Sequence, residues 1–203
     1  MTTQAGLRAA KTALRKKMKD KLKGLTAEDK LRQSMRVTEK LLSLGQYSQA
    51  RSVALYLSME DEINTASILE DVFSSGKVCY VPRYEEGGSR MEMVRLRDLE
   101  DYQGLPTTRW NIKQPERGEE REEALQSEAG LDLILVPGLA FTRTGGRCGR
   151  GRGYYDTYLA RALSSLPSQP TTIGLAFAEQ LVEEEELPTD EHDHNIDFVI
   201  SSE

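Results

Sequence analysis

An apolar run, a glycine-rich loop and a helical repeat follow one another over residues 131–166, and this pattern constrains the fold most. Residues 131–136 are almost entirely apolar and end at Pro137-Gly138, which predicts a buried parallel strand followed by a turn. Residues 145–153 contain five glycines and three arginines, and apolar side chains at helical spacing then predict a helix from Tyr154 to about Leu166. A strand, a glycine-rich loop and a helix in this order place a ligand at the carboxyl edge of an open α/β sheet.

Strands and helices alternate along the rest of the chain. Thr26 to Asp29 resemble a capping box that opens a helix ending near Gly45, and Thr65 should cap a helix over residues 66–73. The other expected strands cover residues 53–57, 78–81 (stopped by Pro82), 91–96, 172–177 and 196–200, with a long connection from 106 to 130. This alternation implies an α/β fold with an open, mainly parallel sheet flanked by helices, in a Rossmann-like three-layer architecture. No repeat or linker divides the chain, so we expect a single domain over residues 1–203.

The glycine-rich loop has the composition of an anion site. Glycine lets the backbone approach a ligand, and Arg147, Arg150 and Arg152 can contact phosphate oxygens at the start of the following helix. The spacing matches neither a P-loop nor the G-x-G-x-x-G register, which argues against a dinucleotide site. A solvated loop is one alternative, and an RNA-binding loop that stacks bases on Tyr154 and Tyr155 is another.

Composition narrows the class of protein. Hydrophobic residues make up 38% and charged residues 30% of the chain, as in a soluble globular protein, and the net charge of −6 argues against general nucleic-acid affinity. Cys79 and Cys148 form no C-x-x-C pair, which suits a reducing cytosol, and no apolar stretch reaches the length of a membrane span. We therefore expect a cytoplasmic protein with neither a nucleic-acid nor a membrane partner.

The N-terminal residues are basic and amphipathic. Residues 1–23 carry eight lysines and arginines against Asp20 alone, and an apolar stripe runs at helical spacing from Leu7 to Leu25. Three interpretations are open: a mitochondrial transit peptide, a solvated helix face, or a basic helix that supplies a ligand-binding lysine.

Two acidic segments supply further candidates for chemistry. After the first strand, Glu62 could accept hydrogen bonds from an amino-heterocycle and Met59 could form an apolar wall, although an acidic turn is the simpler interpretation. Near the last strand, Asp193 could join Asp156 in holding Mg²⁺ on nucleotide phosphates. His192 and His194 lack a third ligand at zinc spacing, so zinc is not favoured and a merely solvated loop stays open.

Six segments together resemble the 5-formyltetrahydrofolate cyclo-ligase family, also called methenyltetrahydrofolate synthetase. The resemblance runs from about Ala10 to Ile200, and its segments are residues 56–62, 91–95, 110–115, 136–141, 149–156 and 187–193. The chain departs from many relatives at Thr142, where an acid is usual, at Cys148, where an apolar residue is usual, and at Arg152, where Lys or Gly also occurs.

The resemblance implies an ATP- and Mg²⁺-dependent ligase that converts 5-formyltetrahydrofolate to 5,10-methenyltetrahydrofolate and releases ADP and phosphate. Phosphorylation of the formyl oxygen would be followed by ring closure through the folate N10. Both substrates would be partners of a chain that we expect to be monomeric, and a mitochondrial pool stays open. An inactive folate- or nucleotide-binding regulator is the remaining alternative.

The resemblance also assigns roles to individual residues. Catalysis would rest on Arg150, Arg152 and Tyr154, and Mg²⁺ on Asp156 and Asp193. The ATP site would comprise Lys11, Thr12, Ala13, Leu14, Arg15, Arg147, Cys148, Gly149, Arg150, Gly151, Arg152, Gly153, Tyr154 and Tyr155. The folate site would comprise Leu57, Glu62, Arg150, Gly151, Arg152, Gly153 and Tyr154, to which we add Met59 and Trp110 as expected apolar walls.

Overall fold

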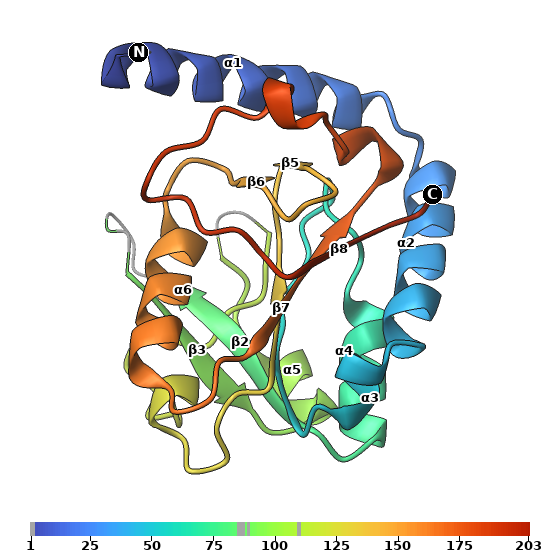
Figure 1. The fold of residues 1–203 in the computed structure, drawn as a ribbon. Coiled ribbons are helices and arrows are strands. Elements are labelled where there is room, and N and C mark those ends of the chain that lie inside the picture. Colours follow the sequence, from blue (N-terminus) through green and yellow to red (C-terminus); the bar gives the residue numbers. More distant parts are fainter. Residues whose placement is uncertain (1–2, 85–87, 89, 109–110) are drawn as a thin grey trace.

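A mostly parallel six-stranded sheet forms the centre of the computed structural model, which describes residues 3–84, 88, 90–108 and 111–203 (Figure 1). In spatial order its strands are β3 (Met91–Leu96), β2 (Val78–Tyr84), β1 (Ser52–Ala54), β4 (Leu133–Val136), β7 (Thr171–Ala176) and β8 (Phe198–Ser201). Only β3 runs antiparallel to its neighbour in this sheet. A separate short hairpin pairs β5 (Ala140–Phe141) with β6 (Arg147–Cys148).

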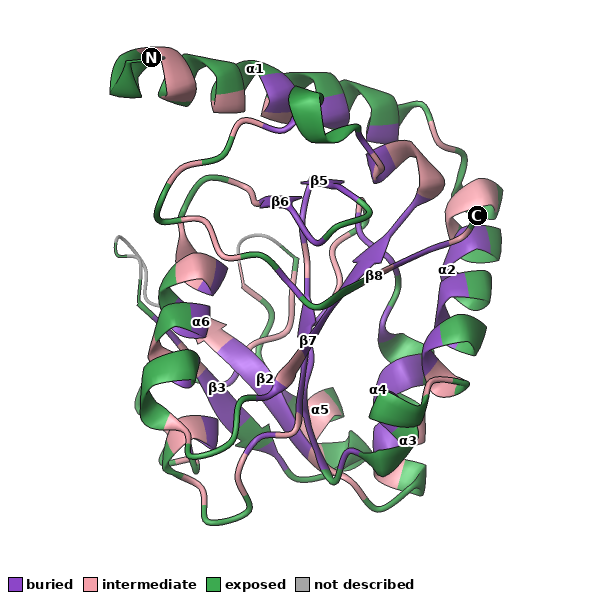
Figure 2. Cartoon of the chain, viewed as in Figure 1, coloured by how far each residue is buried: buried purple, intermediate pink, exposed green. Residues whose placement is uncertain are grey.

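Helices cover both sides of the sheet, which confirms the predicted α/β class. In Figure 1, α6 (Tyr154–Ser165) lies on one side, and α2 (Ala27–Leu42), α3 (Gly45–Gln49) and α4 (Ala66–Ser74) lie on the other. The central strands β1, β4 and β7 are almost wholly buried, as Figure 2 shows, and the core is continuous through them. Within the described residues, no helix is both long enough and apolar enough to cross a membrane.

Helix α1 (Gln4–Lys23) crosses the top of the view in Figure 1, above β5 and β6. Its Leu14, Met18 and Leu22 are buried, whereas Ala10 of the predicted stripe is exposed. The basic N-terminal segment is therefore packed onto the body of the protein by the central part of its apolar stripe.

Several strands differ from their predicted bounds. β4 and β8 each begin two residues later than predicted, at Leu133 and Phe198, and β7 is shifted by one residue. β1 and β2 differ most. β1 leaves the ladder after Ala54 instead of continuing to Leu57, and residues 55–57 extend toward the site described below. β2 does not stop at Pro82 but runs to Tyr84, so that prediction was wrong. β1 pairs only with residues 78–80 of β2, so Pro82 has a ladder partner on one side alone, where a missing N–H group is tolerated.

Helix starts and short helices account for the other differences. Thr26 caps α2 as predicted, since its Oγ1 accepts a hydrogen bond from the Asp29 N–H at 3.1 Å. Thr65 precedes α4 but does not cap it: its hydroxyl donates to the Tyr56 carbonyl at 2.7 Å, and the Asn64 side chain accepts from the Ala66 N–H. Among the residues that the structure describes, the unpredicted elements are the short helices α3 and α5 (Leu99–Gly104), three 3-10 helices and the hairpin of β5 and β6.

A buried ion pair fastens the long connection between residues 106 and 130. Arg121 donates two hydrogen bonds to Asp101 of α5, at 2.7 and 2.8 Å, and both side chains are 6% exposed. Asp98 caps the same helix by accepting from the Asp101 N–H, so α5 and the connection are held at one point.

Arg121→Ala should lower the free energy of unfolding by about 3 kcal/mol, because it leaves a buried carboxylate without its main partner. Hydrogen bonds from Arg121 and Arg97 hold the pKa of Asp101 well below its usual range. A depressed folded-state pKa stabilises the fold above the unfolded value of about 4, and this contribution is lost as the pH falls. The difference between parent and variant in urea unfolding should therefore shrink in acid.

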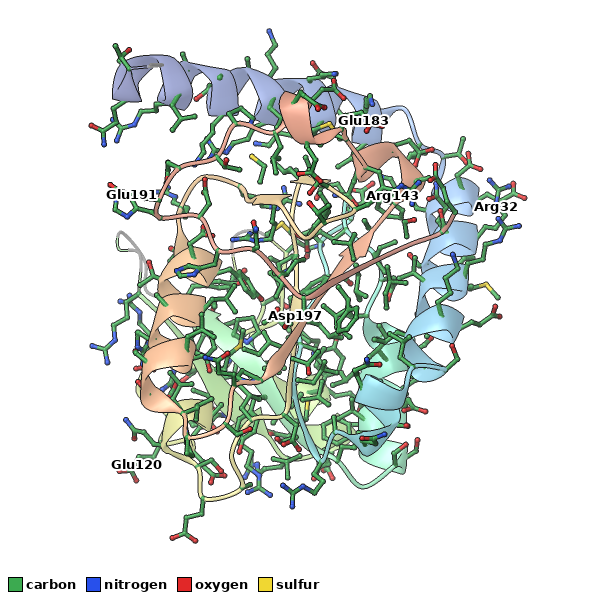
Figure 3. All side chains as sticks on the ribbon, in the orientation of Figure 1. Arg32, Glu120, Arg143, Glu183, Glu191 and Asp197 are labelled. Carbon is green, nitrogen blue, oxygen red and sulfur yellow. The ribbon has the colours of Figure 1, made fainter. Side chains whose placement is uncertain are left out.

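Arg143→Ala is the matched control for this change. Arg143 lies on the turn between β5 and β6, near the C-terminus (Figure 3), and pairs with Glu203 in an exposed ion pair whose arginine side chain is 72% exposed. Such a pair contributes less than about 1 kcal/mol. Equal losses in the two variants would contradict the structural importance of Arg121.

Candidate active site

A cavity of about 520 Å³ opens where the carboxyl ends of β1 and β4 meet α1 and the start of α6. This is the edge at which an open α/β sheet binds its ligands. The walls come from six parts of the chain around this edge. These are α1, the chain after β1, the end of β2 with the connection that follows α5, the turn after β4, the glycine-rich loop with the start of α6, and the segment before β8. The lining residues are Lys11, Arg15, Lys19, Tyr56, Leu57, Met59, Glu62, Tyr84, Ile112, Pro137, Gly138, Arg147, Cys148, Gly149, Arg150, Gly151, Arg152, Gly153, Tyr154, Tyr155, Asp156, Asp190 and Asp193.

Glycine is required in the loop by backbone geometry. Gly151 and Gly153 have φ values of +100° and +71°, a region that side chains disfavour. Gly153 precedes α6, and the first residues of this helix, Tyr154 to Asp156, line the cavity, so the helix begins at the site. Arg15 of α1 lies directly over the loop, where its Nε donates to the Gly149 carbonyl at 2.9 Å.

Arg147 and Arg150, two of the three loop arginines, are already engaged by acids. Arg147 is 3% exposed and forms an ion pair with Asp156 at 2.5 Å while donating to the Pro137 carbonyl. Arg150 reaches across the cavity to Asp61 and Glu62, and Arg152 is exposed at its rim. The three arginines therefore have three different environments.

Glu62 is the most enclosed carboxylate of the site. Its side chain is 7% exposed, and its Oε2 accepts a hydrogen bond from the Met59 N–H at 2.9 Å. Burial raises the pKa of Glu62 above its ordinary value, and the positive charge of Arg150 partly offsets that shift. A buried carboxylate fixed in this way can accept hydrogen bonds from the ring nitrogens of a ligand.

Lys11 joins α1 to the segment before β8. Its ammonium group contacts Asp190 at 2.8 Å and Asp193 at 2.5 Å, and its side chain is 13% exposed. Burial lowers the pKa of Lys11, but the hydrogen bonds to the two aspartates outweigh burial and raise it above its ordinary value. The segment is held further by the Asp190 N–H, which donates to the Asp193 carboxylate at 2.7 Å.

Asp156 and Asp193, the predicted Mg²⁺ ligands, both line the cavity. Within the described part of the chain, no group of three or more His, Cys, Asp or Glu side chains comes together to hold a metal. Mg²⁺ in nucleotide sites is held through one or two carboxylates together with phosphate oxygens and water, so a pair of aspartates beside a phosphate site fits that ion.

Aromatic and apolar side chains form the other wall. The rings of Tyr84 and Tyr154 lie 4.8 Å apart between centroids, and Met59, Leu57 and Ile112 complete the apolar lining. Sequence reasoning missed Tyr84 because it ended this strand at Val81, before Pro82. A strand extended by three residues would have placed Tyr84 at the ligand-binding edge.

Several predicted residues lie elsewhere. Thr12 and Ala13 are exposed outside the cavity lining, and Leu14 is buried in the core. Trp110 lies outside the described residues. Sequence reasoning also missed Tyr56, Ile112, Lys19, Asp61 and Asp190; the last two stand beside predicted residues in the same acidic segments.

The departures from the family pattern have structural roles. Thr142 is fully buried, and its Oγ1 accepts a hydrogen bond from the Gly146 N–H at 2.9 Å, which closes the turn between β5 and β6. Cys148 lines the cavity, and burial raises the pKa of its thiol. The thiol therefore stays protonated and acts as a small apolar wall.

Comparison with known proteins identifies the family. A family model described as the 5-formyltetrahydrofolate cyclo-ligase family matches residues 7–202. The 5-formyltetrahydrofolate cyclo-ligase of Mus musculus is 46% identical over 192 residues, which cover 95% of this chain and 93% of the mouse protein. The chain belongs to the 5-formyltetrahydrofolate cyclo-ligase family. Members of this cyclo-ligase family are ligases that form a C–N bond.

Further relatives agree with the cyclo-ligase assignment. A probable 5-formyltetrahydrofolate cyclo-ligase of Caenorhabditis elegans is 34% identical over 197 residues, covering 97% of this chain and 94% of the relative. The solved 5,10-methenyltetrahydrofolate synthetase of Aquifex aeolicus superposes with a TM-score of 0.73 at 28% identity, over 95% of this chain and 90% of that one. The synthetase from Mycoplasma pneumoniae, at 22% identity and a TM-score of 0.71 over 95% and 99% of the chains, shows the same fold.

Proposed function

We propose that this chain converts 5-formyltetrahydrofolate to 5,10-methenyltetrahydrofolate at the expense of ATP, in the presence of Mg²⁺. One observation carries the proposal: a single cavity combines a glycine-arginine loop at a helix start with an aromatic wall and a buried carboxylate. The glycine-arginine loop suits a phosphate chain. The aromatic wall and the buried carboxylate suit a flat amino-heterocycle, so the two substrates would meet between these two parts of the cavity.

The resemblance to the family implies the order of steps. The formyl oxygen would take the γ-phosphoryl group and ADP would leave; the folate N10 would then attack the activated carbon and release its proton to solvent, and phosphate would depart as the ring closes. The nucleophile belongs to the substrate, so the protein's task is to position both substrates and to neutralise the charge on the phosphoryl group. Residues from different parts of the chain share that task.

On the nucleotide side, Lys11 and Arg15 of α1 would contact phosphates from above the loop, and Arg152 would do so from the rim. Asp156 and Asp193 would hold Mg²⁺, which would offset the negative charge of the phosphate chain. Asp156 now contacts Arg147, and Asp193 now contacts Lys11. To receive the ion, each aspartate must share its negative charge between the metal and that side chain.

On the folate side, Glu62 would accept hydrogen bonds from the heterocycle, and Tyr154 with Met59 and Leu57 would enclose its faces. The side chain of Arg150 reaches from the loop to Glu62, and it would contact both substrates. The protein would work as a monomer in the cytoplasm, without nucleic acid or membrane. The Arabidopsis thaliana relative named as mitochondrial leaves a mitochondrial pool open.

Turnover should require all three components. When purified protein is given 5-formyltetrahydrofolate, ATP and Mg²⁺, the absorbance should rise as the methenyl product forms. Omission of ATP or of Mg²⁺ should abolish this rise. Folded protein that forms no product in the complete mixture would reject the enzymatic proposal and favour a binding protein. Salt-sensitive RNA binding in place of turnover would favour the RNA-binding alternative.

A further inference from the structure

We infer that Asp61 is a positioning residue that holds Arg150 in place between the two substrates, an inference that rests on the proposed function. The family pattern assigned no role to Asp61, and the sequence reading treated it only as part of an acidic turn. The structure gives it the strongest contact that Arg150 makes.

The contact is bidentate. Arg150 donates from Nη2 to Asp61 Oδ1 at 2.5 Å and from Nη1 to Asp61 Oδ2 at 3.2 Å, while its Nε donates to Glu62 Oε1 at 3.1 Å. A guanidinium group has five N–H groups, so two remain for a ligand. The two acids thus fix the plane of the guanidinium and leave donors on its outer corners free.

The loop itself cannot fix Arg150. Its neighbours Gly149 and Gly151 have no side chains to pack against it, and Gly151 adopts a φ of +100°. Arginine also has several rotatable bonds, so an unheld side chain would sample many positions over the cavity. Asp61 and Glu62 lie 89 and 88 residues away in the sequence, and together they define one orientation.

Asp61 is suited to this role because the turn that carries it is itself held. It stands in the turn after β1, where the Glu62 N–H donates to the Met59 carbonyl at 3.2 Å and Glu62 accepts from the Met59 N–H in return. Its side chain is 31% exposed, against 7% for Glu62. Asp61 can therefore be replaced with little disturbance of the core, whereas Glu62 is expected to contact the folate directly.

The test is a double-mutant cycle on turnover. Asp61→Ala should lower kcat/KM about ten-fold to a hundred-fold, because misplacement of a positioned group by about 1 Å has an effect of this size. In an Arg150→Ala background the same substitution should leave kcat/KM unchanged or higher, because the residue that Asp61 positions is gone and one of the two carboxylates left without a cation is removed. Asp61→Glu should restore a large part of the activity.

Glu60→Ala is the matched control, since Glu60 is the exposed neighbour of Asp61 in the same turn and should leave kcat/KM unchanged. Thermal unfolding of each variant establishes that it is folded. An active parent whose Asp61 and Arg150 effects multiply independently would overturn the positioning role and leave the proposed function intact. An inactive parent would overturn both.

Discussion

Arg150→Ala should lower kcat/KM by about a hundred-fold to a thousand-fold, the range seen when a group that stabilises developing charge is removed. Arg150 is 27% exposed and has partners on two sides, Asp61 and Glu62, so its removal also leaves two carboxylates facing the cavity without their cation. Those negative charges would repel the phosphate chain of ATP. The measurement is initial rate against ATP and folate concentration.

Two further variants make the result specific. Arg150→Lys keeps the positive charge but loses the planar guanidinium group and its paired N–H donors, so it should recover only part of the lost activity. Arg143→Ala removes an exposed arginine outside the cavity lining and should behave like the parent in turnover. Parent-like rates for Arg150→Ala would show that the loop arginine takes no part in the reaction.

Asp193→Asn should raise the Mg²⁺ concentration needed for half-maximal rate by at least about ten-fold, because it removes the charge of a proposed metal ligand. Asp193 is 19% exposed and is held by Lys11 and by the Asp190 N–H, so its carboxylate is fixed in position before any ligand binds. The variant leaves Lys11 paired with Asp190. The expected change is therefore in metal dependence and not in folding.

Glu186→Gln is the control for that experiment. Glu186 also pairs with α1, through Lys17 at 2.7 Å, but both side chains are about half exposed, at 45% and 51%. It should leave the Mg²⁺ dependence unchanged. Calorimetric titration of Mg²⁺ with ADP gives a second readout that does not depend on turnover; unchanged affinity in Asp193→Asn would refute its role as a ligand.

The sequence predicted the architecture and the loop because both depend on short-range patterns. Apolar runs, helical spacing and glycine content place β4, the loop and α6 without knowledge of any distant contact. Where tertiary contacts determine the local structure, the predictions differ from what is observed. Pro82 is accepted in β2 because β1 is short, and Thr65 bonds to Tyr56 instead of capping α4.

The site shows the same contrast between what short-range patterns predict and what tertiary contacts determine. Lys11, Glu62 and the loop residues could be named from the family pattern, but the ion pairs of Lys11 and Arg150 could not, because each links residues far apart in the chain. Asp61 and Asp190 show this well: each looks like any other acid in an acidic segment, and only the position of Arg150 or Lys11 gives it a distinct environment.

The position of Lys11 has a consequence for how the protein is made. Lys11 and Asp193 are 182 residues apart, yet they meet in one ion pair. A ribosome makes Lys11 long before Asp193, so this wall of the cavity can assemble only after the residues around Asp193 have been synthesised. Until the segments that cover them are made, Leu14, Met18 and Leu22 of α1 lack the neighbours that bury them in the folded protein.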